Sequence, residues 1–158
     1  PVNAEANMAE AIQSIGKDNI AGVYSANDGM AGGVIKALEA AGVTDLPPIT
    51  GQDAELPAVQ RIVAGEQYMS VYKSYPQEAE NAAEMVVAHI QGRDIQFDAL
   101  TRDKVDSPSH QGIPAQLVPV VALTKANIKD TVVADGFYKV SDICTAKFAA
   151  DCAEIGLK

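Results

Sequence analysis

Three short apolar runs separated by helical patterns limit the folds open to this chain more than any other feature of its sequence. The runs lie at 20–25, 47–53 and 68–73, and the helical patterns between them lie at 29–41 and 55–64. Strands that alternate with helices at this spacing pair in parallel, because each crossover helix returns the chain to the same end of the sheet. We therefore expect an α/β fold, with a parallel sheet and helices on both of its faces.

Polar side chains follow each of the three apolar runs. Asn27 comes after the first run, Asp53 ends the second and Lys73 ends the third. The carboxyl ends of parallel strands lie along one edge of a sheet, and ligands bind in the crevice outside that edge. We therefore expect an amide, a carboxylate and an ammonium to converge on one site. None of them is a nucleophile with its own base, so the set predicts a hydrogen-bonding site for a polar ligand, without catalytic residues.

Length and charge narrow the classes of function. The 158 residues suit one domain with its own core. The net charge of −9 opposes a nucleic-acid-binding surface, which needs a basic stripe. The chain has no apolar segment of about 18 residues, the length that spans a membrane. It opens on Pro1 and has no signal peptide, so we expect a processed or excised chain.

The first helical pattern, at 3–17, precedes any strand, so we expect that the strand before it is missing. Asp28 stands where it can cap the next helix, by accepting from the amides at the start of that helix. Gly29, Gly32 and Gly33 follow it, but they do not form the dinucleotide-binding glycine pattern. We interpret them as sites of close helix–sheet packing.

The second half of the chain continues with weaker patterns. A helix is expected at 76–92, a polar loop or short excursion at 93–112, a strand at 118–123 and a short helix at 124–133. The only two cysteines, Cys144 and Cys152, lie eight residues apart in the tail. They form either a disulfide, which needs a turn between them, or two unpaired small hydrophobic side chains. No His or third Cys lies nearby, so no metal site is expected.

Four segments carry a resemblance to a known family. They are residues 25–33 (SANDGMAGG), 50–65 (TGQDAELPAVQRIVAG), 69–73 (MSVYK) and 126–137 (ANIKDTVVADGF). In this order and spacing they resemble the bacterial periplasmic sugar-binding proteins of ABC transporters, the family that includes the xylose-binding proteins. The resemblance extends from about Asn3 to Asp142. It implies the C-terminal lobe of a type I periplasmic binding protein, in incomplete form.

The family's two α/β lobes, joined by a three-stranded hinge, close over a monosaccharide. Its sugar-binding Asn, Asp and Lys match Asn27, Asp53 and Lys73. The resemblance implies a xylose-like ligand, a membrane permease as partner, export to the periplasm or the outer face of the membrane, and no cofactor. Family members also stack sugars on aromatic rings. Tyr72 and Tyr75 are candidates by proximity, although core or hinge packing is the preferred interpretation for both.

The resemblance also implies a division of the chain, because it covers only the second part of a family member. Residues 1–73 would form the core of the C-terminal lobe, 74–112 the hinge crossing with a helix and loop of the missing first lobe, 113–142 the return strand and helix, and 143–158 the tail. The helix at 76–92 would then need a partner for its apolar stripe. That partner would be the missing N-terminal lobe or a second copy of the chain.

Two other functions share this fold class. One is a doubly wound sugar-modifying enzyme, with Asp53 as general base and Lys73 as its partner. The other is the sugar-sensing domain of a transcription regulator, which the acidic charge opposes. His89 lies on a helix flank and His110 in a loop, so neither is expected to be catalytic. A non-enzymatic sugar-binding protein is the preferred interpretation.

Overall fold

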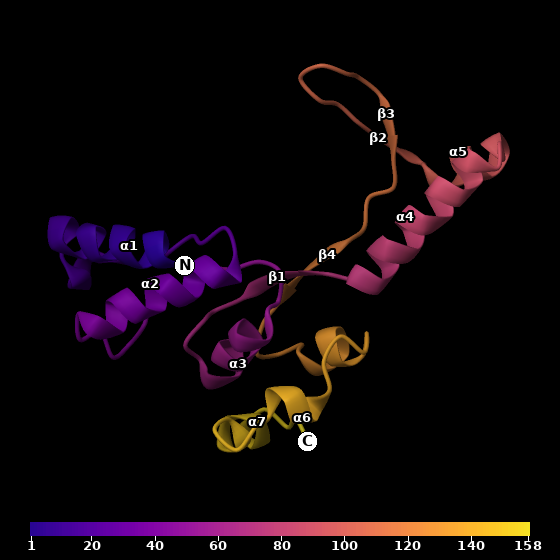
Figure 1. The fold of residues 1–158 in the computed structure, drawn as a ribbon. Coiled ribbons are helices and arrows are strands. Elements are labelled where there is room, and N and C mark those ends of the chain that lie inside the picture. Colours follow the sequence, from indigo (N-terminus) through magenta and orange to yellow (C-terminus); the bar gives the residue numbers. More distant parts are fainter. The chain divides into compact units, whose positions relative to one another are not determined.

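The computed structural model describes all 158 residues and divides into two compact units. The first unit contains residues 1–72 and 121–158, and the second contains residues 73–120. Figure 1 follows the chain from the first unit through the second and back. None of the helices has the length and apolarity that a membrane crossing requires.

Parallel strands at the centre of the first unit confirm the predicted α/β class. Val23 pairs in parallel with Ile49, and Gln52 pairs in parallel with Val71. Val71 belongs to strand β1, Ser70–Lys73, which is hydrogen-bonded to strand β4, Val120–Leu123 (Figure 1). The predicted strands at 68–73 and 118–123 are therefore present, in shorter form.

The predicted strands at 20–25 and 47–53 are reduced to single bridges, and their side chains explain why. Pro47 and Pro48 have no N–H to donate to a neighbouring strand. At the other end of the pair, the backbone amide of Ser25 donates to the side-chain Oγ1 of Thr50 at 3.0 Å. A side chain there takes the place of the carbonyl that would continue the ladder.

Two helices pack together over the first bridge. Helix α1, Val2–Ile15, is followed by the 3₁₀ turn Lys17–Asn19, and helix α2, Asp28–Ala40, packs against α1. Met8 from α1, Leu38 from α2 and Ile49 from the bridge are buried in one hydrophobic cluster. Helix α2 supplies most of this cluster, whereas Met8 is the only buried residue of α1 and Ile15, at the end of α1, is exposed.

Helix α3 and the C-terminal segment form the other part of the first unit. Helix α3, Leu56–Ala64, ends at Gly65, whose φ of 84° is in the left-handed region. It contacts two short helices, α6 at Val140–Ile143 and α7 at Ala149–Glu154. The helix predicted at 124–133 is only a short π-helical turn, η2, Lys129–Val133. The side chain of Asn127 accepts from the amide of Thr124 at 2.8 Å and so competes with a regular helical start.

The second unit has more secondary structure than predicted. Helix α4, Tyr75–Ile90, is followed by helix α5, Asp94–Leu100, and by an antiparallel hairpin of β2, Asp103–Val105, and β3, Ile113–Ala115. The prediction of a loop across 93–112 was therefore wrong for α5 and β2. Helix α5 has only seven residues and is followed by a polar stretch, which concealed it in the sequence; it packs on α4 through the rings of Phe97 and His89, 5.7 Å apart.

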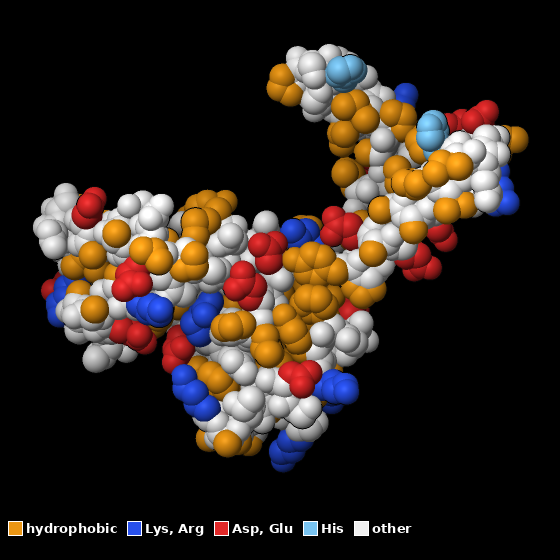
Figure 2. All heavy atoms as spheres, viewed as in Figure 1, with side chains coloured by type: hydrophobic (Ala, Val, Ile, Leu, Met, Phe, Trp, Pro, Cys, Tyr) orange, Lys and Arg blue, Asp and Glu red, His pale blue; other side chains and the backbone are white.

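Large apolar side chains of α4 and α5 face solvent. Val86, Val87, Ile90 and Ile95 are between 47% and 88% exposed. Figure 2 shows hydrophobic side chains gathered along these two helices. An apolar surface of this kind is unusual on an isolated unit.

Gly33 fixes how closely α1 approaches α2, and its replacement has a testable cost. A Cβ at Gly33 would lie 2.5 Å from the carbonyl oxygen of Pro1 and 3.1 Å from the amide nitrogen of Glu5. We expect Gly33→Ala to lower the free energy of unfolding by about 1–2 kcal/mol, because the displaced backbone outweighs the gain in helix propensity. Urea unfolding followed by circular dichroism measures this loss.

Gly32 provides the matched control on the same helix. A Cβ there would lie 3.3 Å from Nη1 of Arg61, a side-chain atom that needs to shift by only a few tenths of an ångström, whereas Gly33 faces backbone at 2.5 Å. We expect Gly32→Ala to leave the free energy of unfolding unchanged or to raise it by up to about 1 kcal/mol. Equal losses in both variants would contradict the packing role assigned to Gly33.

Candidate functional site

The end of the first predicted strand places Asn27 at the start of α2. Its backbone is extended, with φ −154°, and its Oδ1 accepts from the amide of Met30 at 2.9 Å. Asn27, and not Asp28, is therefore the cap of α2, and the prediction for Asp28 was wrong. The reason is geometric, because Asp28 is already the first helical residue and its side chain points into the protein interior. Capping uses Oδ1 of Asn27, so its Nδ2 group is the part suited to donate to a ligand.

The carboxylate of Asp28 is fully buried and accepts hydrogen bonds at both oxygens. Its Oδ2 accepts from Oγ of Ser70 at 2.8 Å and from the amide of Glu55 at 2.9 Å. Its Oδ1 accepts from Nε2 of Gln67 at 2.8 Å. Sequence analysis missed this cluster, because its members are distant in sequence and all of them except Asp28 lie outside the strand-end pattern.

Arg61 completes the buried cluster around Asp28. Its Nε and Nη2 donate to Oε1 of Gln67 at 3.1 and 2.9 Å, and Nη2 also donates to the carbonyl oxygen of Asp28 at 2.9 Å. Burial raises the pKa of Asp28, against the opposing effects of its hydrogen bonds and of the Arg61 charge. Burial lowers the pKa of Arg61, against the nearby carboxylates. The cluster joins α2, α3 and β1 without exposing a reactive group.

Asp53 occupies an unusual backbone conformation at the end of the second predicted strand. Its φ is 92°, and that of the next residue, Ala54, is 48°. A residue other than glycine in such a region costs about 1–3 kcal/mol and persists only where its surroundings hold it. The side chain of Asp53 is half-buried, and its amide donates to the carbonyl oxygen of Val71 at 3.0 Å. Strain of this kind is concentrated at functional sites.

Lys73 ends β1 and is the first residue of the second unit. Its Nζ lies 5.7 Å from the ring centre of Tyr75. In that unit it also lines a hollow of about 280 Å³, together with the polar side chains of Glu78, Asn81 and Gln116. Hydrogen bonds join the segments that carry Asn27 and Asp53, since the amide of Asp28 donates to the carbonyl of Gln52 at 3.0 Å. A joint site that includes Lys73 stays a prediction.

The remaining candidates from the sequence include Tyr72, His89 and His110. Tyr72 is only 2% exposed, its hydroxyl donates to Oδ2 of Asp135 at 2.9 Å, and its ring lies 5.8 Å from that of Phe137. These contacts agree with the preferred interpretation of Tyr72 as a core residue. His89 and His110 are exposed. No group of three or more His, Cys, Asp or Glu side chains is placed to hold a metal ion.

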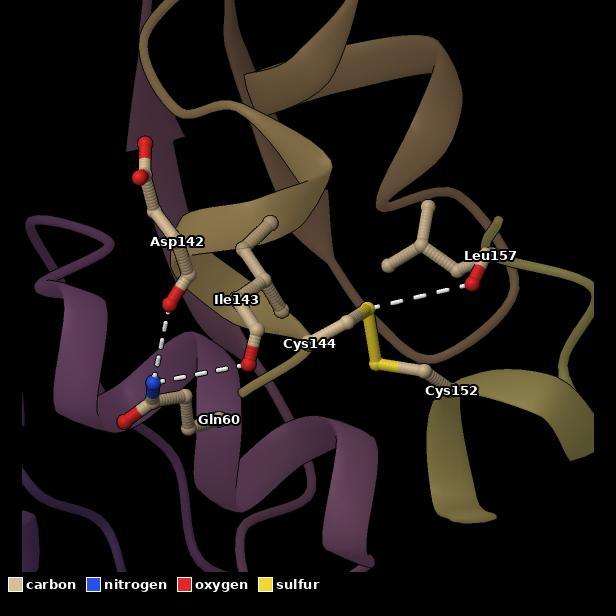
Figure 3. Close-up of a disulfide and its surroundings, with 6 residues drawn as sticks. All are labelled: Gln60, Asp142, Ile143, Cys144, Cys152 and Leu157. Carbon is tan, nitrogen blue, oxygen red and sulfur yellow. Dashed lines mark hydrogen bonds between the residues drawn. A yellow bond between two sulfur atoms is a disulfide. The ribbon is translucent and has the colours of Figure 1, made fainter. Parts of the chain in front are cut away.

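A disulfide joins Cys144 to Cys152 (Figure 3). Their Cα atoms are 5.9 Å apart, because the chain turns between α6 and α7. The Sγ of Cys144 lies 3.8 Å from the carbonyl oxygen of Leu157, a contact in which a disulfide sulfur has no hydrogen to donate. Nε2 of Gln60 on α3 donates toward the carbonyls of Asp142 and Ile143, at 3.1 and 3.4 Å. The closed loop is thus anchored on α3.

Comparison with known proteins defines the class of this chain. The family model described as a periplasmic binding protein domain matches residues 1–94, which is more than half of the sequence. The chain therefore belongs to the periplasmic binding protein family. The predicted resemblance to periplasmic sugar-binding proteins is confirmed.

The relatives include two xylose-binding proteins. The D-xylose-binding periplasmic protein of Escherichia coli (strain K12) is 37% identical over 143 residues, which cover 90% of this chain and 42% of the relative. That of Haemophilus influenzae is 39% identical over 127 residues, which cover 80% of this chain and 37% of the relative. The chain thus spans about two fifths of the length of these curated relatives.

A solved structure supports the same fold. The carbohydrate transporter solute-binding protein of Chloroflexus aurantiacus, in complex with D-glucose, has a TM-score of 0.67 and 25% sequence identity to this chain. The match covers 88% of this chain and 40% of that protein. The predicted fold, an incomplete lobe of a type I periplasmic binding protein, is confirmed.

Proposed function

We propose that this chain is the C-terminal, ligand-contacting part of a monosaccharide receptor that serves an ABC sugar importer. The relatives support a sugar as the ligand, and the two xylose-binding relatives favour a xylose-like one. Their periplasmic names support export, and a membrane permease would receive the sugar. The protein would be a binding protein and not an enzyme, because Asp53 and Lys73 would stabilise a ground-state ligand.

The backbone of Asp53 is the observation that carries this proposal. A half-buried carboxylate held at φ 92°, directly after a parallel strand, points to a position selected for ligand contact. Sugar hydroxyls both donate and accept hydrogen bonds, so a sugar site needs acceptors, donors and groups that do both. Asp53 would accept, Lys73 would donate, and Asn27 would donate through Nδ2. Charged partners make such hydrogen bonds stronger than neutral ones do.

The rest of the receptor would complete the site. The chain spans about two fifths of the xylose-binding relatives, so a second lobe of similar size would close over the sugar. The same lobe would cover the exposed apolar side chains of α4, such as Val86 and Ile90. We therefore expect the 158-residue chain alone to bind sugar weakly or not at all, since lobe closure supplies much of the burial.

Calorimetric titration of D-xylose into the complete receptor that contains this chain tests the proposal. We expect saturable binding, and we expect Asp53→Asn to raise Kd at least about tenfold by removing a charged hydrogen-bond partner. Asparagine also tolerates the left-handed conformation, so this variant should keep the fold. Asp45→Asn is the matched control, since Asp45 is exposed in the loop that leads into the same strand, at its opposite end. Its Kd should stay within about twofold of the unsubstituted value.

The outcomes separate a sugar-binding protein from an enzyme. Absence of binding to D-xylose, D-glucose and other monosaccharides would overturn the proposal. Turnover of any sugar would favour the enzyme. Equal effects of Asp53→Asn and Asp45→Asn would leave sugar binding in place but remove Asp53 from the site.

A further inference from the structure

The segment 53–55 is held by an unusual arrangement of its backbone amides. Three successive N–H groups donate to three different acceptors, and none of these is a neighbour in sequence. The amide of Asp53 donates to the carbonyl of Val71 at 3.0 Å, that of Ala54 to Oγ of Ser70 at 3.0 Å, and that of Glu55 to Oδ2 of Asp28 at 2.9 Å. Two of the three acceptors are side chains, so the conformation of this segment depends on the identity of residues 28 and 70.

Two of these acceptors, the hydroxyl of Ser70 and the carboxyl group of Asp28, are hydrogen-bonded to each other. The hydroxyl accepts from Ala54 and donates its own hydrogen to Oδ2 of Asp28 at 2.8 Å. Asp28 and Ser70 are both completely buried, so water does not replace these hydrogen bonds. The orientation of the Ser70 hydroxyl is thereby fixed by its hydrogen bond to the carboxyl group of Asp28.

The other side of the segment is also fixed. The carbonyl oxygen of Ala54 accepts from the hydroxyl of Tyr138 at 3.0 Å. The other carboxylate oxygen of Asp28 is held by Gln67, which in turn binds Arg61. Asp28 thus cannot reorient without breaking hydrogen bonds to α3 and β1. Packing alone provides no comparable directional constraint on a residue at φ 92°.

We propose that Asp28 and Ser70 are positioning residues of the ligand site, which act by holding the backbone of Asp53 in its left-handed conformation. This inference rests on the proposed function, since it treats the side chain of Asp53 as a sugar ligand. Asp28 and Ser70 themselves stay buried and touch no sugar. They determine the direction of the Asp53 carboxylate, and through it the sugar hydroxyl that the site selects.

Amide hydrogen exchange of the 158-residue chain tests the positioning without any sugar. Ser70→Ala removes one hydroxyl and keeps the small buried side chain. We expect exchange at Ala54 and Glu55 to accelerate at least about tenfold, while the amides of the α1–α2 core keep their rates. Ser25→Ala is the matched control, because Ser25 is also a buried serine, and its hydroxyl donates to the carbonyl of Asn27 at 2.9 Å and not to segment 53–55. Unchanged exchange at Ala54 in Ser70→Ala would overturn the proposal.

A double-mutant cycle in the complete receptor tests the link to sugar binding. We expect Ser70→Ala to weaken D-xylose binding at least about fivefold in the unsubstituted receptor and less than about twofold in the Asp53→Asn background, because it acts through Asp53. Equal effects in both backgrounds would indicate a general structural role and overturn the proposal. If the unsubstituted receptor binds no monosaccharide, the proposed function fails, whereas the exchange experiment still decides whether the Ser70 hydroxyl holds segment 53–55.

Discussion

Gly51→Ala is expected to destabilise the first unit more than any other single substitution considered for this chain. A Cβ at this position would overlap Oδ1 of Asp28 and would lie 2.5 Å from Nε2 of Gln67. Neither group is a free end of a flexible side chain, because both are buried and hydrogen-bonded to each other at 2.8 Å. Relief of the overlap would leave a buried carboxylate with an incomplete set of donors. Overpacking and a lost charged hydrogen bond together cost about 3–5 kcal/mol.

Urea unfolding measures the effect of Gly51→Ala, with Gly22→Ala as its control. Gly22 precedes Val23 in the neighbouring bridge, and a Cβ there would make an ordinary contact of 3.4 Å with the carbonyl oxygen of Pro48. We expect Gly22→Ala to change the free energy of unfolding by less than about 1 kcal/mol. A Gly51→Ala variant as stable as the unsubstituted chain would mean that the carboxylate of Asp28 does not lie beside Gly51.

Loss of the disulfide is expected to have the second largest effect. The Cys144–Cys152 bond closes a loop with a sequence separation of 8 residues. By the loop-entropy relation, a closure of that size contributes roughly 2–3 kcal/mol to the free energy of unfolding. The Cys144→Ala, Cys152→Ala double variant should lose this amount. The loss should fall on α6 and α7 first, because they meet the rest of the unit mainly through α3.

Reduction of the unsubstituted chain is the control that separates the effect of losing the disulfide bond from the effect of replacing the two cysteine side chains. Thermal unfolding with a phosphine reductant should lower the melting temperature of the unsubstituted chain to about that of the double variant, and should leave the variant unchanged. If reductant has no effect on the unsubstituted chain, the disulfide does not stabilise the folded tail. Disulfides persist in oxidising compartments, so a stabilising bond would also agree with the proposed export.

Much of the fold could be predicted from periodicity and spacing. The alternation of apolar runs and helical patterns predicted parallel strands, and Val23, Ile49, Gln52 and Val71 pair in this way. Strand lengths could not be predicted, since the ladder stops where Thr50 offers a side chain to Ser25. Helix α5 was missed because it is only seven residues long and its partner ring, His89, lies on another helix. Such tertiary contacts leave no periodic signal.

The candidate site was only partly accessible from the sequence. Strand ends identify Asn27 and Asp53, because topology alone brings such positions to one edge of a sheet. The capping role was wrongly assigned to Asp28, because Asn and Asp are equally suited to cap a helix and the two residues are adjacent in the sequence. The direction of each side chain decides between them, and that direction depends on Gln67 and Ser70, 39 and 42 residues away. The left-handed backbone of Asp53 likewise carries no signature in its neighbours.

The first unit is built from two stretches of the chain that are separated in sequence by the second unit. Residues 1–72 and 121–158 form one compact body, and the strands where the chain leaves and re-enters, β1 and β4, are hydrogen-bonded to each other. The chain therefore leaves and re-enters the first unit on adjacent strands. The second unit is, in this sense, an insertion between two adjacent strands. The hydrogen bonds that surround Asp53 come from residues of the first unit on both sides of this insertion, Ser70 before it and Tyr138 after it.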